Sequence, residues 1–323
     1  MPLNKNYQLF QDKLAVYGII IEPMQMNGLE EKVEMYRVVK NEEKENRNHW
    51  DFREENNINF LVTHYTVCNF LKTMDLFTKD IPSGRVSAHY VITEQEEELP
   101  GGVVFCVVPE EYRAWHAGIS CWEETKNLNA SSIGIEFVNK GFDDKTYKYS
   151  DKDCNWYPFC SQQIESGKLL MASIQKRWGI LPQNIVAHGD IAVERKSDPG
   201  PLFPWGAIYT WAVTERNKPS TLVHAINDLG AWLNDQEIVN VFHSSSISEH
   251  RPLKEPLPQG ISEEFCYAYL QKLGYSDQSK QKESLWAFRM HHVDNQCTGS
   301  GITRTVEKKD MAMALGLVSK YKP

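Results

Sequence analysis

The sequence predicts an α/β fold followed by a small helical module, and three observations carry this prediction. Short apolar stretches recur between residues 58 and 188, a long helix pattern lies among them, and a proline- and serine-rich segment precedes three short helical patterns. Strands and helices that alternate along a chain pack as helices on a sheet. With 323 residues and 41% hydrophobic content, the chain can form one large domain or two smaller ones around a sizeable core.

Five stretches have the composition of buried strands. They are "INFLVTHYT" (58–66), "RVSAHYVIT" (85–93), "GGVVFCVVP" (101–109), "SIGIEFVN" (132–139) and "NIVAH" (184–188). Each is rich in β-branched and apolar residues, and the fourth alternates between apolar and other residues. We therefore expect these stretches to form one sheet.

A long helix is predicted between the fourth and fifth strands, at residues 161–180. Leu170, Ile174 and Trp178 follow one another at four-residue spacing, which puts them on one face of a helix. Gly179 directly after this pattern is a typical helix end.

The composition divides the chain into four parts. Residues 1–57 end in a charged run and are expected to be an N-terminal extension with a solvated face, packed on the main domain but not itself a core unit. Residues 58–243 form the main domain, and 244–260, with several prolines and serines, form a linker. Residues 261–323 form a separate module.

Three short helices are expected in this last module, at 262–274, 283–292 and 308–321. The first begins with a serine and two acidic residues and ends with a glycine, which matches the caps and the dipole of a helix. A bundle of this size is near the lower limit for an independent hydrophobic core.

Charge and composition exclude several classes of function. The formal net charge is −8, and nucleic-acid binding needs a basic face, so no nucleic-acid partner is expected. No apolar run is long enough for a transmembrane segment, and no leader peptide is visible at the start. The seven cysteines form no CxxC pair, which argues against a cysteine zinc cage. We expect a monomer.

A different kind of metal site is suggested by residues at strand ends. His64 and His188 each fall at the end of a predicted strand, and Asp198 precedes Pro199. Two imidazoles and one carboxylate are a common ligand set for a catalytic zinc that keeps one position for water. Asp190 competes with Asp198 for the carboxylate position, and spacing alone does not decide between them.

The motifs together carry a resemblance to a known family. "FLVTHYT", "VSAHYVI", "RAWHAG", "NASSIGIEFVN" and "VAHGDIAVERKSDPGPLFPW" resemble, in this order over about 58–205, the zinc-dependent type-2 N-acetylmuramoyl-L-alanine amidases. Peptidoglycan recognition proteins are relatives of that family. The resemblance implies a mixed central β-sheet flanked by helices, and it makes 58–243 a zinc amidase catalytic domain.

The resemblance assigns a Zn²⁺ site and a base. His64, His188 and Asp198 match the zinc ligands, which leaves Asp190 as a loop hydrogen bonder. Glu136, in "GIEFVN", matches the general base that takes a proton from a zinc-bound water. Its position on an apolar strand is expected to raise its pKa toward the working range, because burial disfavours the charged carboxylate.

Further positions are assigned roles at the substrate. Lys196, two residues before Asp198, matches the residue that stabilises the oxyanion of the reaction. His116, Trp115 and Asn129 are expected to line the substrate groove. The substrate is then peptidoglycan or a muropeptide, cut between the lactyl group of N-acetylmuramic acid and L-alanine.

The C-terminal module carries a second, less specific resemblance. "LWAFRMHH" and the segment after it resemble the three-helix peptidoglycan-binding domains of wall hydrolases, although "DNQCTGSGITRTVEKKD" departs from their usual acidic-glycine turn. A wall-binding module favours the cell envelope or periplasm, while the missing leader leaves the cytoplasm open.

Two alternatives compete with the amidase prediction. A non-catalytic peptidoglycan-binding protein would share the fold, but such proteins tend to lose a zinc ligand, and this chain keeps the three ligand positions. A cysteine hydrolase using Cys68, four residues after His64, would need a base beside the thiol, which proximity in sequence does not show.

Overall fold

The computed structural model of the chain describes most of the residues of the predicted main domain and of the C-terminal module. The described residues are 6–29, 32–39, 50–53, 57–79, 84–143, 155–209, 262–293 and 305–322. They belong to two compact units. The first comprises 1–119, 127–141 and 157–181, and the second comprises 120–126, 142–156 and 182–323.

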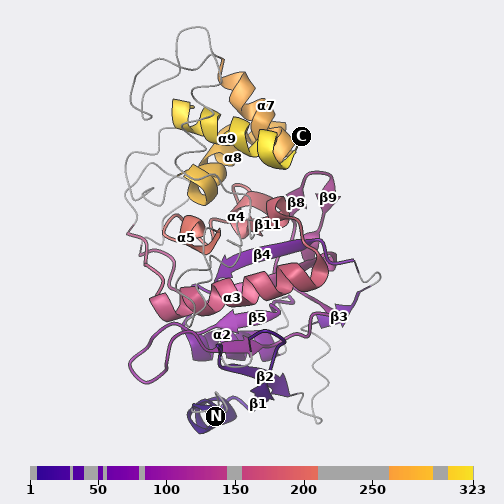
Figure 1. Ribbon diagram of the computed structural model, residues 1–323. Helices are drawn as coiled ribbons and strands as arrows, with labels where there is room; N and C mark the ends of the chain where they lie inside the picture. Colours follow the sequence, from indigo (N-terminus) through magenta and orange to yellow (C-terminus); the bar gives the residue numbers. More distant parts are fainter. Residues whose placement is uncertain are drawn as a thin grey trace, which may run out of the picture. The chain divides into compact units, whose positions relative to one another are not determined.

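A mixed sheet forms the centre of the first unit (Figure 1). Its strands there are ordered β1-β2-β6-β5-β10-β4. β10 runs parallel to both β4 and β5, β2 is parallel to β6, and the pairs β1–β2 and β5–β6 are antiparallel. The bounds are β1 Ile20–Met24, β2 Met35–Val39, β4 Phe60–Tyr65, β5 Tyr90–Ile92, β6 Val104–Cys106 and β10 Ser132–Phe137. This mixed sheet with its flanking helices confirms the predicted fold class.

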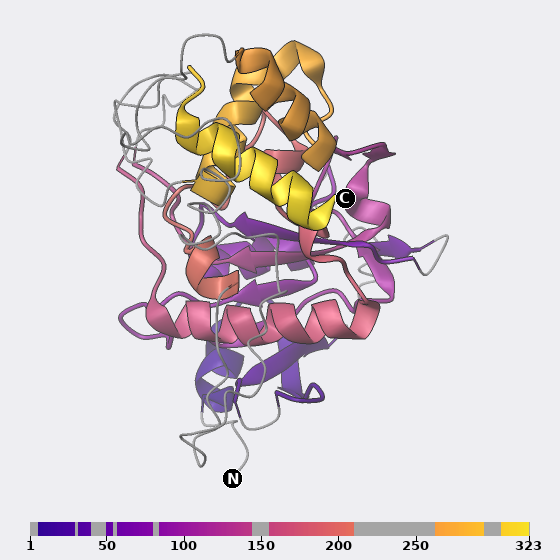
Figure 2. The same ribbon diagram turned by 45° about the horizontal axis from the view of Figure 1, so that its top comes forward.

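The long helix α3 (Ser161–Trp178) packs on one face of this sheet, as Figures 1 and 2 show. Gln163 donates through Nε2 to the carbonyls of Ile92 and Val138, at 3.0 and 2.9 Å. A Cβ at Gly167 would lie 2.6 Å from the Phe137 ring, so the helix can approach the sheet closely only with glycine there. α3 ends at Gly179, whose φ of 65° is the left-handed conformation predicted for its cap.

The opposite face of the sheet is covered by α1 (Tyr7–Ala15) and α2 (Phe70–Thr78). Phe10 and Phe70 pack edge-on against each other and against Phe105 of β6. Tyr36 of β2 belongs to the same fully buried cluster.

The expectation that residues 1–57 form no core unit is therefore wrong for residues 6–39. This segment supplies a helix and two strands of the sheet, and its apolar side chains are buried. The charged run that suggested a solvated face lies mostly outside the described residues. Pro23, which argues against a strand in the sequence, sits in the edge strand β1, where a missing N–H can be tolerated.

Smaller elements of the first unit lie around its sheet. β3 (Trp50–Phe52) pairs antiparallel with β7 (Tyr112–Ala114), and a short 3₁₀ helix, η1, covers Leu128–Ala130. Arg53, directly after β3, donates to the carbonyls of Ala130 and Ser132, at 2.6 and 2.7 Å. β3 is thereby tied to the start of β10.

The second unit contains the helices at the C-terminal end of the chain. Its elements are β8 (Cys121–Trp122), β9 (Thr125–Lys126), η2 (Pro182–Asn184), β11 (Ile185–Ala187), α4 (His188–Ile191), α5 (Trp205–Tyr209), α7 (Glu263–Leu273), η3 (Gln278–Lys280), α8 (Gln281–Phe288), the π-helical turn η4 (Arg289–Val293) and α9 (Lys308–Tyr321). α7, α8 and α9 pack against one another (Figure 2). Arg289 forms a buried two-bond ion pair with Asp310, at 2.8 and 2.6 Å.

The three predicted helices of the C-terminal module are present with ends close to those expected. α7 begins after Ser262, whose side chain accepts from the N–H of Glu264, and ends before Gly274. The predicted linker, 244–260, lies outside the described residues. Because α7–α9 share a compact unit with β11, α4 and α5, the predicted boundary between 243 and 261 stays a prediction.

The predicted strands are present, although 85–93 contributes only its last part to the sheet as β5. The cysteines among the described residues are free thiols. Among the same residues, no helix combines the length and the apolar character that crossing a lipid bilayer requires.

Candidate metal centre and active site

His64 and Glu136 are placed by the pairing of two parallel strands. In the register of β4 and β10, Glu136 is the direct partner of His64. Paired residues of neighbouring strands point to the same face of a sheet, so both side chains lie on the face opposite α3. His64 is 1% exposed and Glu136 is 8% exposed. The sheet register therefore brings a ring nitrogen and a carboxylate together inside the protein.

His188 and Asp198 are held by one compact loop of the second unit. His188 opens α4 directly after β11, and the N–H of Gly189 donates to the carbonyl of Asp198 at 2.9 Å. His188 Nδ1 lies 3.0 Å from Asp198 Oδ2, and both side chains are buried. The Asp198–Pro199 peptide bond is cis. Gly200, with φ of 80°, closes the loop in a conformation that favours glycine.

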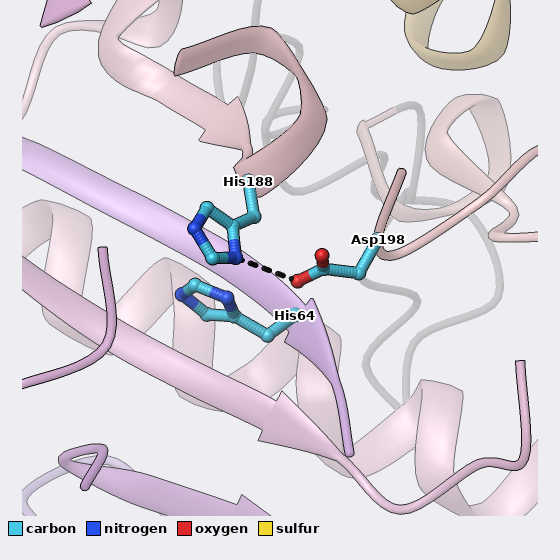
Figure 3. A group of neighbouring side chains, drawn as sticks. All are labelled: His64, His188 and Asp198. Carbon is cyan, nitrogen blue, oxygen red and sulfur yellow. Dashed lines mark hydrogen bonds and ion pairs between the residues drawn. The ribbon is translucent and has the colours of Figure 1, made fainter. Parts of the chain in front are cut away.

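The side chains of His64, His188 and Asp198 form a set that could hold a metal ion (Figure 3). One ligand atom from each lies within 4.8 Å of the other two, and all three residues are buried. Two imidazoles and a carboxylate are typical ligands of a catalytic zinc, and a fourth position stays open for water. The kinds of donor atom fit Zn²⁺. The structure thus brings together the three residues that the sequence predicted as ligands.

Asp190, the alternative carboxylate, has a different role in the structure. Its Oδ2 accepts from the N–H of Ala187 at 2.8 Å and contacts Nδ1 of His291 at 2.5 Å, and its Oδ1 accepts from the Tyr275 hydroxyl at 2.7 Å. The side chain is almost completely buried. Asp190 is a hydrogen bonder of the loop, as expected once Asp198 is taken as the ligand.

Two tyrosines complete the surroundings of Asp190. The Tyr209 hydroxyl lies 2.9 Å from His291 Nε2. Burial, followed by the nearby Asp190 carboxylate, raises the pKa of Tyr209 and of Tyr275 well above the usual value. Both hydroxyls therefore stay protonated and can donate. The α4 segment that begins with His188 is anchored by residues about one hundred positions further along the chain.

Lys196 lies on the ligand loop, two residues before Asp198. Its side chain is half-buried, and its N–H donates to the Ala192 carbonyl at 3.0 Å. The loop thus carries a cation close in sequence to a ligand, and the oxyanion role stays a prediction.

The residues predicted to contact substrate lie in different environments. Trp115 is half-buried, and the guanidinium of Arg113 lies 4.3 Å from its ring centre. Asn129 is buried, and its Oδ1 accepts from the N–H groups of His116 and Ala117, at 3.0 and 2.7 Å. His116 is also buried, and its Nδ1 lies 3.0 Å from His64 Nε2.

His89, the other histidine in the family's blocks, supports the sheet. It is fully buried, and its Nδ1 accepts from the N–H of Gly134 at 2.9 Å. Burial, with the neighbouring Arg53 guanidinium as a second cause, lowers the pKa of His89 to about 3. His89 is therefore neutral near pH 7.

Sequence reasoning did not single out three residues that adjoin this centre. Ser132 contacts His116, and His291 and Tyr275 contact Asp190. Ser132 lies within a predicted strand, and the other two lie in the C-terminal segment. No local pattern marks them, because each contact joins positions far apart in the sequence or on different elements.

The chain is similar in sequence to known amidases. A family model described as N-acetylmuramoyl-L-alanine amidase matches residues 54–201. The amidase AmiD of Escherichia coli K12 is 32% identical over 82% of this chain and 83% of its own length. The 1,6-anhydro-N-acetylmuramyl-L-alanine amidase AmpD of Enterobacter cloacae is 34% identical over 37% of this chain and 57% of its own length.

Two solved structures are similar over most of the chain. Escherichia coli AmiD, in complex with anhydro-N-acetylmuramic acid-L-Ala-D-γ-Glu-L-Lys, has a TM-score of 0.63 and 29% identity, covering 82% of this chain and 90% of that one. AmpDh3 from Pseudomonas aeruginosa, in complex with an anhydromuramic pentapeptide, has a TM-score of 0.60 and 29% identity, covering 82% and 92%.

Proposed function

The chain belongs to the family of N-acetylmuramoyl-L-alanine amidases, and on this premise we propose that His64, His188 and Asp198 hold a zinc ion at its active centre. As an amidase of this family, it hydrolyses the bond between the lactyl group of N-acetylmuramic acid and L-alanine. The observation that carries the zinc proposal is the buried cluster of two imidazoles and one carboxylate. This donor set suits zinc with one position open.

Glu136 would act as the general base. When bound, zinc would lower the pKa of a water molecule and polarise the amide carbonyl. Glu136 would take the proton of the attacking water and pass it to the nitrogen of L-alanine, so that the amine can leave. Its position supports this role, because it is the strand partner of His64 and points to the same face of the sheet.

Lys196 would stabilise the negative charge that develops on the carbonyl oxygen. It shares a short loop with Asp198, so the loop that holds a zinc ligand also holds this ammonium group. A fixed cation near a developing oxyanion lowers the energy of the transition state more than that of the bound substrate.

The substrate class is a peptidoglycan-derived muropeptide. Two similar structures contain anhydromuramic peptides, from which we infer that this chain also accepts the anhydro form. Trp115 is the best placed of the predicted groove residues, because it is half-buried whereas the other two are buried. Asn129 and His116 are buried and hydrogen-bonded within the protein.

The structure and the relatives also argue against the two alternatives, a non-catalytic binding protein and a cysteine hydrolase. A non-catalytic binding protein has no use for an intact set of three buried ligands, and the relatives reported above are amidases. Cys68 is a half-buried free thiol whose carbonyl accepts from the Thr66 hydroxyl. Neither observation identifies a base that could deprotonate the Cys68 thiol.

The helices α7–α9 would bind peptidoglycan, in keeping with their resemblance to wall-binding modules. We propose that the chain acts as a monomer in the cell envelope, where this polymer lies, with the cytoplasm as the other compartment that the sequence leaves open.

The decisive experiment identifies products by mass spectrometry, with and without a chelator. Purified anhydro-muropeptide is incubated with the chain, and release of the intact stem peptide is expected to stop on zinc removal and return when zinc is added back. Glu136→Gln is expected to keep zinc but lose about 10²–10⁴-fold in kcat, the contribution of a positioned general base. Glu97→Gln, an exposed carboxylate outside the centre, serves as the matched control.

Unchanged product formation in the chelated protein would refute the zinc proposal. A Glu136→Gln variant that turns over at the rate of Glu97→Gln would remove Glu136 from the reaction while leaving the metal site standing.

A further inference from the structure

A series of buried hydrogen bonds links His64 to His116 and Ser132. His64 Nε2 lies 3.0 Å from His116 Nδ1, and His116 Nε2 lies 3.2 Å from Ser132 Oγ. The Ser132 hydroxyl donates to the carbonyl of Leu128 at 2.6 Å. The side chains of His64, His116 and Ser132 are all buried, so water does not compete for these bonds.

The donor and the acceptor of each hydrogen bond in this series can be assigned, starting from the carbonyl of Leu128. A carbonyl only accepts, so the single hydroxyl proton of Ser132 points to Leu128. Ser132 Oγ must then accept, and the proton between it and His116 belongs to His116 Nε2. A neutral His116 carries no proton on Nδ1, which accepts from Nε2–H of His64. His64 is thereby fixed in the tautomer whose Nδ1 has a lone pair for a cation.

The ring of His116 is also fixed in place. Its backbone N–H donates to Asn129 Oδ1 at 3.0 Å, and a Cβ at Gly134 would lie 2.4 Å from its Cγ. Gly134 precedes Glu136 by two residues on β10 and pairs with Val62, two residues before His64. The ring therefore lies directly on the strand pair that carries His64 and Glu136.

We propose that His116 is a positioning residue, which orients His64 and selects Nδ1 of His64 as the nitrogen that binds the metal. This inference rests on the zinc site proposed above and extends it beyond the three ligands. Groups that hydrogen-bond to metal-binding histidines fix the ring orientation and the tautomer, and their loss commonly weakens metal binding by about 10–100-fold. His116 then belongs to the support of the metal site rather than to the substrate groove.

The test measures zinc affinity by competition with a chromophoric chelator, so that it does not depend on turnover. His116→Leu fills similar space but offers no acceptor, and its zinc Kd is expected to rise by about 10–100-fold. His116→Asn places an amide oxygen near the position of Nδ1, and it is expected to restore most of the affinity. The amide oxygen of Asn can accept a hydrogen bond from Nε2–H of His64. If His116 only filled space, His116→Leu would bind zinc at least as tightly as His116→Asn.

A second measurement uses the wild-type protein and needs no substitution. Nitrogen-15 NMR of the zinc-loaded protein distinguishes a metal-bound ring nitrogen from a protonated one. The signals of His64 are expected to show zinc on Nδ1 and a proton on Nε2.

The possible outcomes distinguish a failure of the proposed role of His116 from a failure of the proposed zinc site. If the wild-type chain binds no zinc, the metal site itself is wrong. If the wild type binds zinc and His116→Leu binds it equally well, or if His64 binds through Nε2, the role of His116 is overturned. Should His116→Leu fail to fold, the affinity of His116→Asn and the wild-type NMR signals still decide the question.

Discussion

The two sides of the proposed metal site are held in place by different means. His64 and Glu136 sit on paired strands, where the sheet register alone makes them neighbours. His188 and Asp198 sit on a loop, where Asp190 connects the α4 segment to Tyr275 and His291, far along the chain. The hydrogen bonds of a strand pair are enough to make two residues neighbours on one face, whereas a loop needs partners from elsewhere to bring its residues together. The loop side therefore depends on the C-terminal helices.

The largest expected effect comes from breaking the anchor of the loop. Asp190→Ala leaves the Tyr275 hydroxyl, His291 and the N–H of Ala187 without their buried acceptor. Removal of one partner from a buried charged network commonly costs about 3–5 kcal/mol in the free energy of unfolding. Urea unfolding of the metal-free protein measures this loss, and zinc affinity is expected to weaken with it.

Glu194→Ala is the matched control for this anchor. Glu194 lies on the same loop, is exposed, and pairs only at the surface with Lys280, at 3.2 Å. Such a pair contributes about 0–1 kcal/mol. Equal losses in the two variants would mean that the loop does not depend on Asp190.

The next effect distinguishes the chemistry of the loop from its stability. Lys196→Met is expected to lower kcat by about 10²–10³-fold, the range seen when one stabilising contact to an oxyanion is removed. Zinc content and the free energy of unfolding are expected to stay unchanged, because the side chain of Lys196 is only half-buried. Steady-state kinetics and metal analysis, beside Arg195→Met on the exposed part of the same loop, check this prediction. If Lys196→Met and Arg195→Met have the same kcat, Lys196 does not stabilise the oxyanion.

The last prediction concerns the strand side, whose contribution to stability changes gradually with pH. The pKa of His89 is lowered to about 3 by burial and by Arg53, below the value of about 6.5 expected in the unfolded chain. The unfolded chain therefore binds one more proton than the folded one between these values, and folding stability falls as pH is lowered from about 6.5 toward 3.

The slope expected from this one group is up to about 1.4 kcal/mol per pH unit. Urea unfolding of the metal-free protein between pH 4 and 7 measures it, with His89→Gln beside the wild type. An identical slope in both would show that His89 does not titrate on unfolding.

Much of the fold could be predicted from local patterns. The four-residue spacing of Leu170, Ile174 and Trp178 predicts α3, and Gly179 predicts its end, because these signals lie within a few residues of the structure they determine. The N-terminal strands were missed for the same reason. β1 is short and contains Pro23, so nothing local indicates that it joins the sheet beside β2.

The sequence by itself determined the kinds of donor and their order: two histidines at strand ends, an aspartate ten residues after the second, and a glutamate on an apolar strand. Spacing alone left open which aspartate binds the metal, the family resemblance assigned Asp198, and neither showed how the ligands are supported. The tertiary structure groups Asp198 with the two histidines and shows that Asp190 is bonded instead to His291. It also shows Nδ1 of His116 3.0 Å from Nε2 of His64. The physical reason is that hydrogen bonds between distant residues have no sequence period, so only folding shows which groups meet.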